Sequence, residues 1–595
     1  MDDFMYPRPQ LVREHWQSLN GTWKFCYDDE KKFRFPLTPI EWTHEITVPF
    51  PPESKASGIN DRGFHKICWY QRDFFIQPSG GRILLHFGAV DYSTRVWVND
   101  HLVAEHEGGH TSFHSDITRA LNEAGPQTVT VFVEDDPLDL AKPRGKQDWQ
   151  LEPHSIWYPR TTGIWQPVWL ERVSNTYIHK LRWTPFFEGY EIGCEVFVVG
   201  DVEDDLTVEV KIWHESKMLA DDEYKIIGGE AHRKIALSDP GIDDSRNELL
   251  WSPERPTLLD AEITLRHKGQ VLDKARSYTA MRSVTISRDR FMLNGRPYPL
   301  RLVLDQGYWS DTLLAAPSDD ALKKDVELAK AMGFNGVRKH QKIENPRYMY
   351  WADKLGLLVW EEMPSAYRFT PKAISRMMRE WSDVIDRDYS HPCVIVWVPF
   401  NESWGVPNLT SIQAHRNAVE ALYHLTRTLD ETRPVIGNDG WEASATDILG
   451  IHDYDCDPER LQSRYGQEKA KELFDRRRPG GRILTLDGFP HQGQPIMLTE
   501  FGGIAFKNVK KQPEEGEEII WGYSEVTTEN AFLSLYKRLM NVVNNSSMFS
   551  GYCYTQFADT FQEANGLLTA DRIPKVPIEQ INAITLNLEG RPPPP

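Results

Sequence analysis

The sequence predicts a multidomain fold in which an N-terminal β jelly roll and an immunoglobulin-like β-sandwich precede a C-terminal (β/α)8 TIM barrel. Three observations support this prediction. The chain has 595 residues, which is too long for a single hydrophobic core. Its first half consists of short runs in which hydrophobic and polar residues alternate. Its second half alternates strand-like with helix-like segments, as parallel α/β domains do.

The first half predicts two domains built of strands. From about residue 16 to residue 173, alternating runs such as "GTWKFCYD" and "QTVTVFVED" are separated by glycine, aspartate and proline, which is typical of a jelly roll. Runs such as "LTVEVKIWHE" continue to about residue 285 with more acidic turns, over a length that suits an immunoglobulin-like sandwich. We therefore expect the jelly roll in residues 1–173 and the sandwich in residues 174–285.

The remaining residues, 286–595, predict the barrel. The segment "SDDALKKDVELAKAMGF" has helical spacing, Ser318 as a helix N-cap and Gly333 as a stop signal. Strand-like runs precede and follow it, including "NGVRKH", "LLVWEEMP", "VIVWVPFNE" and "PIMLTEFGG". Such alternation over about 310 residues favours an eightfold barrel over an open sheet.

Composition and charge narrow the classes of partner. The formal net charge is -19 and no basic stripe occurs, so nucleic acids and anionic membranes are poor partners. We find neither a signal-like start nor an apolar run of membrane-spanning length, and the six cysteines lie far apart without a CxxC pair. These features favour a cytoplasmic protein with reduced thiols; an exported protein whose signal has been removed is the alternative.

Two glutamates follow strands of the predicted barrel. Glu402 comes after the apolar run "VIVWVPF" and Asn401, and Glu500 ends "PIMLTE". In a barrel, the carboxyl ends of all strands meet at one mouth, so carboxylates remote in sequence can converge there. Two carboxyl groups of unequal pKa are the requirement of glycoside cleavage, and a separation of roughly 5 to 5.5 Å gives retention of configuration. Capping of strand ends, or pairing with Arg338, is the structural alternative.

Longer motifs resemble glycoside hydrolase family 2 over nearly the whole chain. The segment "HPCVIVWVPFNESWG" is similar to the acid/base signature of that family, and "MLTEFGG" is similar to its nucleophile signature. The segments "GAVDYSTRVWVNDHLVAEHEGGHTSFHSDIT" and "TTGIWQPVWLE" resemble its sugar-binding jelly roll, and "MRSVTISRDRFMLNGRPYPLR" resembles its junction with the barrel. The resemblance implies a retaining hydrolase with Glu402 as general acid/base and Glu500 as nucleophile.

The resemblance also implies roles for neighbouring residues. Asn401 would hydrogen-bond the sugar 2-hydroxyl, and Arg338 would orient Glu500. Because a second carboxylate is near and Trp404 offers an aromatic shelter, we expect a raised pKa for Glu402. The other predicted substrate contacts are Trp404 and, each with a structural role as its alternative, His340, Asp305, Glu362, His452 and Tyr454.

The identity of the sugar is the weakest part of the prediction. We expect an exo-β-glycosidase that favours a terminal β-galactoside, with β-glucuronide, β-galacturonide or α-L-arabinoside as alternatives and an inactive carbohydrate-binding protein as a different class. Asp305 and Gln306 replace the family's usual Asn-x-His stretch, and the Asn-Lys pair of many glucuronidases is not evident after "YTQFAD".

Two further expectations concern ligands and partners. The loop that contains Lys146, Gln147 and Asp148 could reach the sugar, with an ordinary exposed loop as the alternative. Some galactosidases of the family use Mg²⁺ near the acid/base, but we expect no required metal or cofactor here. Because oligomers are common in the family, a homo-oligomer is a further expectation.

Overall fold

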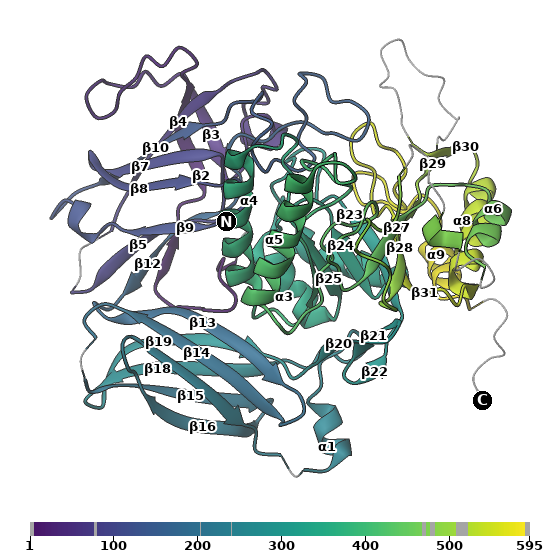
Figure 1. Ribbon diagram of the computed structural model, residues 1–595. Helices are drawn as coiled ribbons and strands as arrows, with labels where there is room; N and C mark the ends of the chain where they lie inside the picture. The colour runs from purple at the N-terminus through teal and green to yellow at the C-terminus, as the bar shows by residue number, and fades with distance from the viewer. Residues whose placement is uncertain are drawn as a thin grey trace.

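The computed structural model describes residues 5–76, 80–202, 204–239, 241–466, 472–475, 482–506 and 522–588. Three bodies lie side by side in Figure 1: a strand-rich part at the upper left, a second strand-rich part at the lower left, and an α/β part at the right. The expected multidomain architecture is therefore present. None of the described helices is long and apolar enough to cross a membrane.

The first part consists of two facing antiparallel sheets. Strand β10 shows why these residues form strands: Val129, Val131 and Val133 are fully buried on one face, while Thr128 on the other face is partly exposed. One sheet has the order β1 (Trp16–Ser18), β12 (Val168–Val173), β5 (Arg82–Phe87) and β9 (Phe113–Asp116). The other has the order β3 (His44–Val48), β2 (Gly21–Tyr27), β4 (Ile67–Phe74), β10 (Gln127–Glu134), β7 (Ser93–Val98) and β8 (His101–Glu107).

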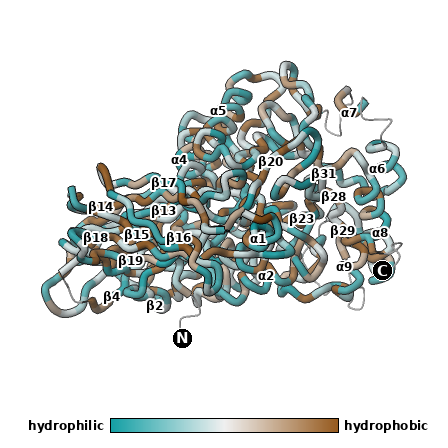
Figure 2. The backbone as a smooth tube through the Cα atoms, turned by 90° about the horizontal axis from the view of Figure 1, so that it is seen from below, coloured by the Kyte–Doolittle hydropathy of each residue, from teal (hydrophilic) through white to brown (hydrophobic). Residues whose placement is uncertain are grey.

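The second part is a smaller antiparallel sandwich. In β15 the residues Leu206, Val208 and Val210 are buried, whereas the intervening residues are partly exposed. Figure 2 shows this mixture of hydrophobic and hydrophilic positions along the strands of the sandwich. One sheet has the order β13 (Tyr177–Phe186), β14 (Glu191–Val199) and β17 (Glu230–Ala236). The other sheet has the order β16 (Lys217–Lys225), β15 (Leu206–His214), β18 (Leu259–His267) and β19 (Gln270–Thr279).

The third part is a parallel barrel. Its strands follow the order β26 (Val394–Val398), β25 (Leu358–Glu362), β24 (Gly336–Lys339), β23 (Leu300–Asp305), β31 (Phe549–Thr555), β28 (Ile496–Gly502) and β27 (Leu449–His452). The remaining position, between β26 and β27, is taken by residues 435–439, which form single parallel bridges from Val435 to Trp397 and from Asp439 to Asn401. This segment therefore stands in the place of a fifth strand.

Helices surround the strands on the outside. The prediction for the first of them is confirmed: the Ser318 side chain accepts a hydrogen bond from Ala321 N, and Gly333 follows the helix with φ +88°. The barrel helices are α2 (Asp319–Ala331), α3 (Pro346–Leu355), α4 (Pro371–Asp388), α5 (Gln413–Leu429), α6 (Pro458–Arg464), α7 (Glu472–Asp475), α8 (Glu529–Asn545) and α9 (Ile578–Thr585).

A loop of the first part, residues 140–160, reaches over the mouth of the barrel, at its upper end in Figure 1. Arg144 N and Gly145 N both donate to Ser365 O in the loop after β25, at 3.0 and 3.1 Å. Gln562, after β31, donates to Trp157 O at 2.7 Å. Gly145 has φ +59°, and a Cβ there would lie 2.3 Å from a barrel carbonyl, so only glycine allows this approach. We name this segment the mouth loop.

Candidate active site

The two predicted catalytic glutamates meet at the mouth of the barrel. Glu402 follows β26 and Glu500 lies in β28. His452, the last residue of β27, lies between them: its Nδ1 is 2.7 Å from Glu402 Oε1 and 3.4 Å from Glu500 Oε2. One ligand atom from each of these three residues lies within 4.8 Å of the other two. The structure thus brings together two carboxylates that are remote in sequence.

Glu500 is held from two sides. Arg338 Nη1 donates to its Oε1 at 3.0 Å, and the Tyr454 hydroxyl donates to its Oε2 at 2.6 Å. Tyr454 in turn stacks on Tyr523, with ring centroids 3.4 Å apart. The carboxylate of Glu500 is therefore fixed in direction before any ligand enters.

Arg338 anchors several of these groups at once. It is fully buried and pairs with Asp439 at 2.8 Å and with Glu362 at 2.7 Å, in addition to Glu500. Its Nη2 donates to Asn401 Oδ1 at 2.6 Å. This bond fixes the orientation of the Asn401 amide, and no described residue accepts from the Asn401 side-chain nitrogen. The arrangement fits the role implied for Asn401, which is donation to a hydroxyl of the sugar.

The backbone at Glu402 is unusual. Glu402 and Ser403 have φ values of 51° and 57°, in the left-handed region that residues with a side chain rarely adopt. Such a conformation costs of the order of 1 kcal/mol per residue and persists where the surroundings enforce it. Here Glu402 N donates to Asp439 O at 3.0 Å and Ser403 N donates to Asn438 Oδ1 at 2.9 Å. The turn lets the chain leave β26 while Glu402 still faces Glu500.

The charge state of Glu402 differs from the sequence prediction. Burial alone would raise the pKa of Glu402, but the hydrogen bond and positive charge of His452, with the charge of Lys146, bring it below its ordinary value. The imidazole of His452 is buried, which disfavours its charge, yet Glu500, Asp439 and Glu402 raise its pKa to about 10. The expectation of a raised Glu402 pKa was wrong because it left out the imidazolium.

Two other predictions need correction. Asp305 does not face the carboxylate pair: its oxygens bind Lys339 Nζ at 2.8 Å and Gly307 N at 2.9 Å. Glu362 has no exposed surface, and its oxygens are occupied by Arg338 and by Gln341 N. Burial raises the pKa of Glu362 to about 7. These two carboxylates therefore support their neighbours and do not lie where a sugar could touch them.

The remaining predicted contacts lie around Glu402. His340 Nδ1 lies 3.0 Å from Glu362 without hydrogen-bond geometry. Burial, with the nearby charge of Arg338, lowers the pKa of His340 well below its usual value. Trp404 is partly exposed beside the mouth loop, 5.7 Å from Trp157 between ring centroids.

Sequence reasoning missed Asp439 and Tyr523. Asp439 binds Arg338, His452 and the Thr499 hydroxyl, the last at 2.9 Å. The sequence does contain a signal for Asp439, because this residue ends the strand-like run "PVIGND". Tyr523 carries no sequence signal that we recognise, because its role depends on stacking against a residue far away in the chain.

Glu402, His452 and Glu500 are also the described residues whose ligand atoms are close enough to hold a metal ion. A cation bound there would displace the proton of His452 and occupy both carboxylates. The three groups already form hydrogen bonds and ion pairs with one another, with Arg338 and with Asp439.

Comparison with protein families identifies all three parts of the chain. Residues 284–588 match the model described as "Glycosyl hydrolases family 2, TIM barrel domain". Residues 56–172 match the sugar binding domain of the same family, and residues 176–282 match a third model named "Glycosyl hydrolases family 2".

Named relatives are distant in sequence, and the share of each relative that this chain matches differs. A β-glucuronidase of Canis lupus familiaris is 24% identical over 89% of this chain and 87% of that protein. A β-galactosidase of Thermoanaerobacter pseudethanolicus is 24% identical over 71% of this chain and 54% of that protein. The solved structure of a β-glucuronidase from Ruminococcus gnavus is 21% identical, with a TM-score of 0.77 over 98% of this chain and 99% of that one.

Proposed function

The chain belongs to glycosyl hydrolase family 2 and is a glycoside hydrolase, and from this premise we propose that it is a retaining exo-β-glycosidase that removes a terminal uronic acid. Glu500 is the nucleophile and Glu402 is the general acid/base. A β-glucuronide is the substrate that the relatives favour, in place of the β-galactoside expected from the sequence.

The separation of the two carboxylates carries the proposal of a retaining reaction. Their nearest ligand oxygens lie within 4.8 Å of each other. Retaining glycosidases place the carboxyl groups roughly 5 to 5.5 Å apart, whereas inverting ones leave roughly 6.5 to 9.5 Å for a water molecule. The shorter separation leaves no room for that water between acid and base.

The hydrogen bond between His452 and Glu402 supplies the acid. In the free protein the proton resides on His452, and its transfer along the 2.7 Å contact makes Glu402 a neutral acid beside a neutral imidazole. Glu500 attacks the anomeric carbon while the bond to the leaving oxygen breaks and that oxygen takes the proton of Glu402. Glu402 then removes a proton from water, whose oxygen attacks the anomeric carbon and releases Glu500.

Lys146 supports a uronic acid as the sugar. The residue is 6% exposed, and among the described residues no carboxylate pairs with its ammonium group. Its charge acts on Glu402, His340 and Glu563, so it lies among the site groups. A carboxylate on the substrate would supply this ammonium group with a charge-assisted hydrogen-bond partner.

A neutral sugar such as galactose is the second candidate. Glu563 interacts electrostatically with Lys146, and its own negative charge would repel a uronate. In addition, the Asn-Lys pair of many glucuronidases is not evident in the loop that contains Glu563. Burial raises the pKa of Glu563, which weakens this repulsion because the carboxyl group is then more often neutral.

A panel of nitrophenyl glycosides tests the proposal. We expect the highest kcat/KM with the β-glucuronide or the β-galacturonide, and lower values with the β-galactoside and the α-L-arabinopyranoside. If a neutral glycoside is turned over fastest, the proposal that the terminal sugar is a uronic acid is wrong, but the proposed retaining mechanism is not affected. No turnover of any member, with measurable sugar binding, would contradict the proposed activity as a whole.

A further inference from the structure

A row of aromatic side chains borders the candidate site. Trp441, Trp404, Trp157 and Trp149 follow one another, with centroid distances of 5.5, 5.7 and 4.8 Å between neighbours. Tyr367 lies against three of them, at 5.5 to 6.1 Å. We name these five residues the aromatic row. They come from three barrel loops and from the mouth loop.

The aromatic row differs from the tryptophans of the core. All five of its members are partly exposed. By contrast, the barrel tryptophans Trp360, Trp381 and Trp397 are fully buried. A row whose only purpose was to fill a core would be covered in the same way, so the exposed rings of the aromatic row are available for contact with a ligand.

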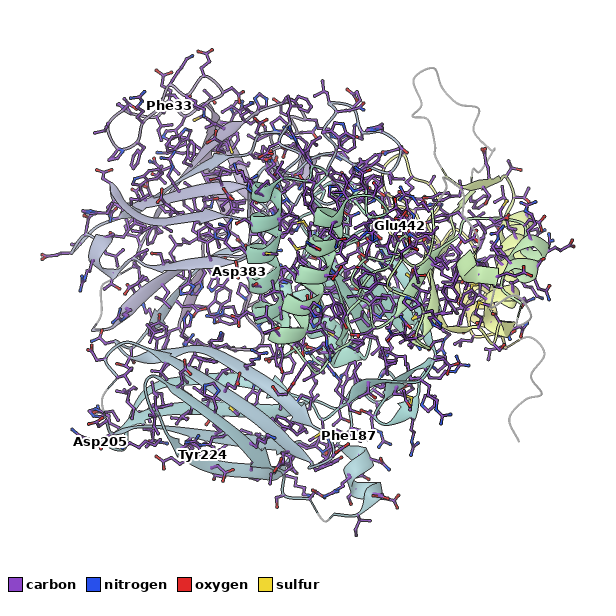
Figure 3. All side chains as sticks on the ribbon, in the orientation of Figure 1. Phe33, Phe187, Asp205, Tyr224, Asp383 and Glu442 are labelled. Atoms are coloured by element: carbon purple, nitrogen blue, oxygen red, sulfur yellow. The ribbon has the colours of Figure 1, made fainter. Side chains whose placement is uncertain are left out.

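Both ends of the aromatic row are held in place. Asp148, fully buried, accepts hydrogen bonds from Gln150 N and His154 N, each at 2.8 Å, and thereby closes the turn that carries Trp149. At the other end, Arg482 stacks on Trp441 at 3.3 Å and pairs with Glu442 at 3.1 Å. Figure 3 labels Glu442 near the upper end of the barrel. A preformed surface of this kind loses little entropy when a ligand binds.

The aromatic row lies on the side of the acid/base. Trp404 is two residues after Glu402 in the same turn. Burial chiefly raises the pKa of Tyr367, and the charge of Glu402 adds to that effect, so the two side chains are near each other. The rings next to the nucleophile, Tyr454 and Tyr523, form a separate stack. In a retaining glycosidase the acid/base protonates the leaving oxygen and therefore faces the leaving group.

We propose that the aromatic row is the binding site for the leaving group of the substrate, and that it selects leaving groups with a flat apolar face. An aryl group and the apolar face of a second pyranose share this chemistry. The inference rests on the proposed function, because it takes Glu402 as the residue that protonates the leaving oxygen. The length of the row suits a leaving group larger than a single small alcohol.

The test compares substrates that share a sugar and differ in the leaving group. The sugar is the one that the nitrophenyl panel identifies, and the leaving groups are nitrophenyl, a second pyranose, and fluoride, which is too small to reach the row. We expect W149A and W157A to lower kcat/KM about tenfold for the nitrophenyl glycoside or the disaccharide. Turnover of the fluoride should not change. Whichever of these two substrates shows the larger decrease in kcat/KM in the variants identifies the preferred leaving group, an aryl group or a pyranose.

The control variant is W42A, which removes a partly exposed tryptophan of the first domain outside the row. It should leave all three substrates unaffected. Equal losses on the fluoride and the nitrophenyl glycoside, or no loss on any substrate in W149A and W157A, would overturn the inference. Turnover of the fluoride by the wild-type protein tests the proposed function separately, and unchanged turnover of the fluoride by each variant shows that the variant is folded.

Discussion

The two carboxylates proposed to be catalytic sit in different surroundings. Glu500 lies inside a strand, and an arginine and a tyrosine hold its two oxygens. Glu402 lies in a left-handed turn after a strand, and its side chain is 13% exposed against 6% for Glu500. A nucleophile benefits from a fixed direction, whereas an acid/base needs access to a proton source and later to water. The difference in surroundings therefore supports the proposed roles of Glu500 as nucleophile and Glu402 as acid/base.

Removal of the nucleophile should have the largest effect. We expect E500Q to lower kcat by at least about 10⁴-fold on every substrate, because no covalent intermediate can form. Turnover of the glycosyl fluoride should be lost as well, without a burst of fluoride. Substantial turnover of the glycosyl fluoride by E500Q would contradict the assignment of Glu500 as the nucleophile.

Removal of the acid/base should have a smaller effect that depends on the substrate. We expect E402Q to lower kcat/KM by about 10²- to 10⁴-fold for glycosides with poor leaving groups. The glycosyl fluoride needs no proton, so E402Q should release a burst of fluoride stoichiometric with enzyme and then slow down for lack of a base. A variant without this burst would contradict the assignment of Glu402.

Lys146 separates the candidate sugars. We expect K146M to lower kcat/KM for the β-glucuronide by about ten- to a hundredfold, the value of a hydrogen bond to a charged group. The same variant should leave the β-galactoside nearly unchanged. K55M, which removes an exposed lysine of the same domain, serves as the control. Equal effects of K146M on both sugars would argue against recognition of a carboxylate.

The raised pKa of His452 predicts a pH dependence of stability. The folded protein holds the His452 proton more tightly than the unfolded chain, whose histidine titrates near 6.5. The resulting stabilisation is complete below about pH 6.5 and is lost as the pH rises toward 10. The difference in Tm between the wild-type protein and H452Q should therefore shrink from about pH 6 to about pH 9. If the difference in Tm stays constant over this pH range, His452 does not carry the positive charge inferred for it in the folded protein.

Sequence reasoning could reach the strand ends but not the directions of the side chains. Glu402 and Glu500 could be predicted from the sequence because each follows a buried run of a barrel strand. Asp305 also ends a strand, yet it faces Lys339, whose side chain points to the opposite side of β24 from that of Arg338. A shift of one position decides between the two faces, and hydrophobic patterns in strands buried on both sides do not record it.

The charges of the site were also out of reach of the sequence. Asp439 belongs to a segment that forms only single bridges, so it was not recognised as a barrel position. The lowered pKa of Glu402 depends on His452, fifty residues later in the chain and at the end of another strand. Such effects follow from distances between remote groups, which neither composition nor spacing contains.

Chemical trapping of the covalent intermediate tests the central claim most directly. An analogue of the substrate sugar that carries fluorine in place of the hydroxyl next to the anomeric carbon slows release of the sugar from the nucleophile. After digestion, mass spectrometry should find the label on the peptide that contains Glu500. A label on Glu402, or rapid turnover of the panel substrates without a trapped adduct and with inversion of configuration, would contradict the account.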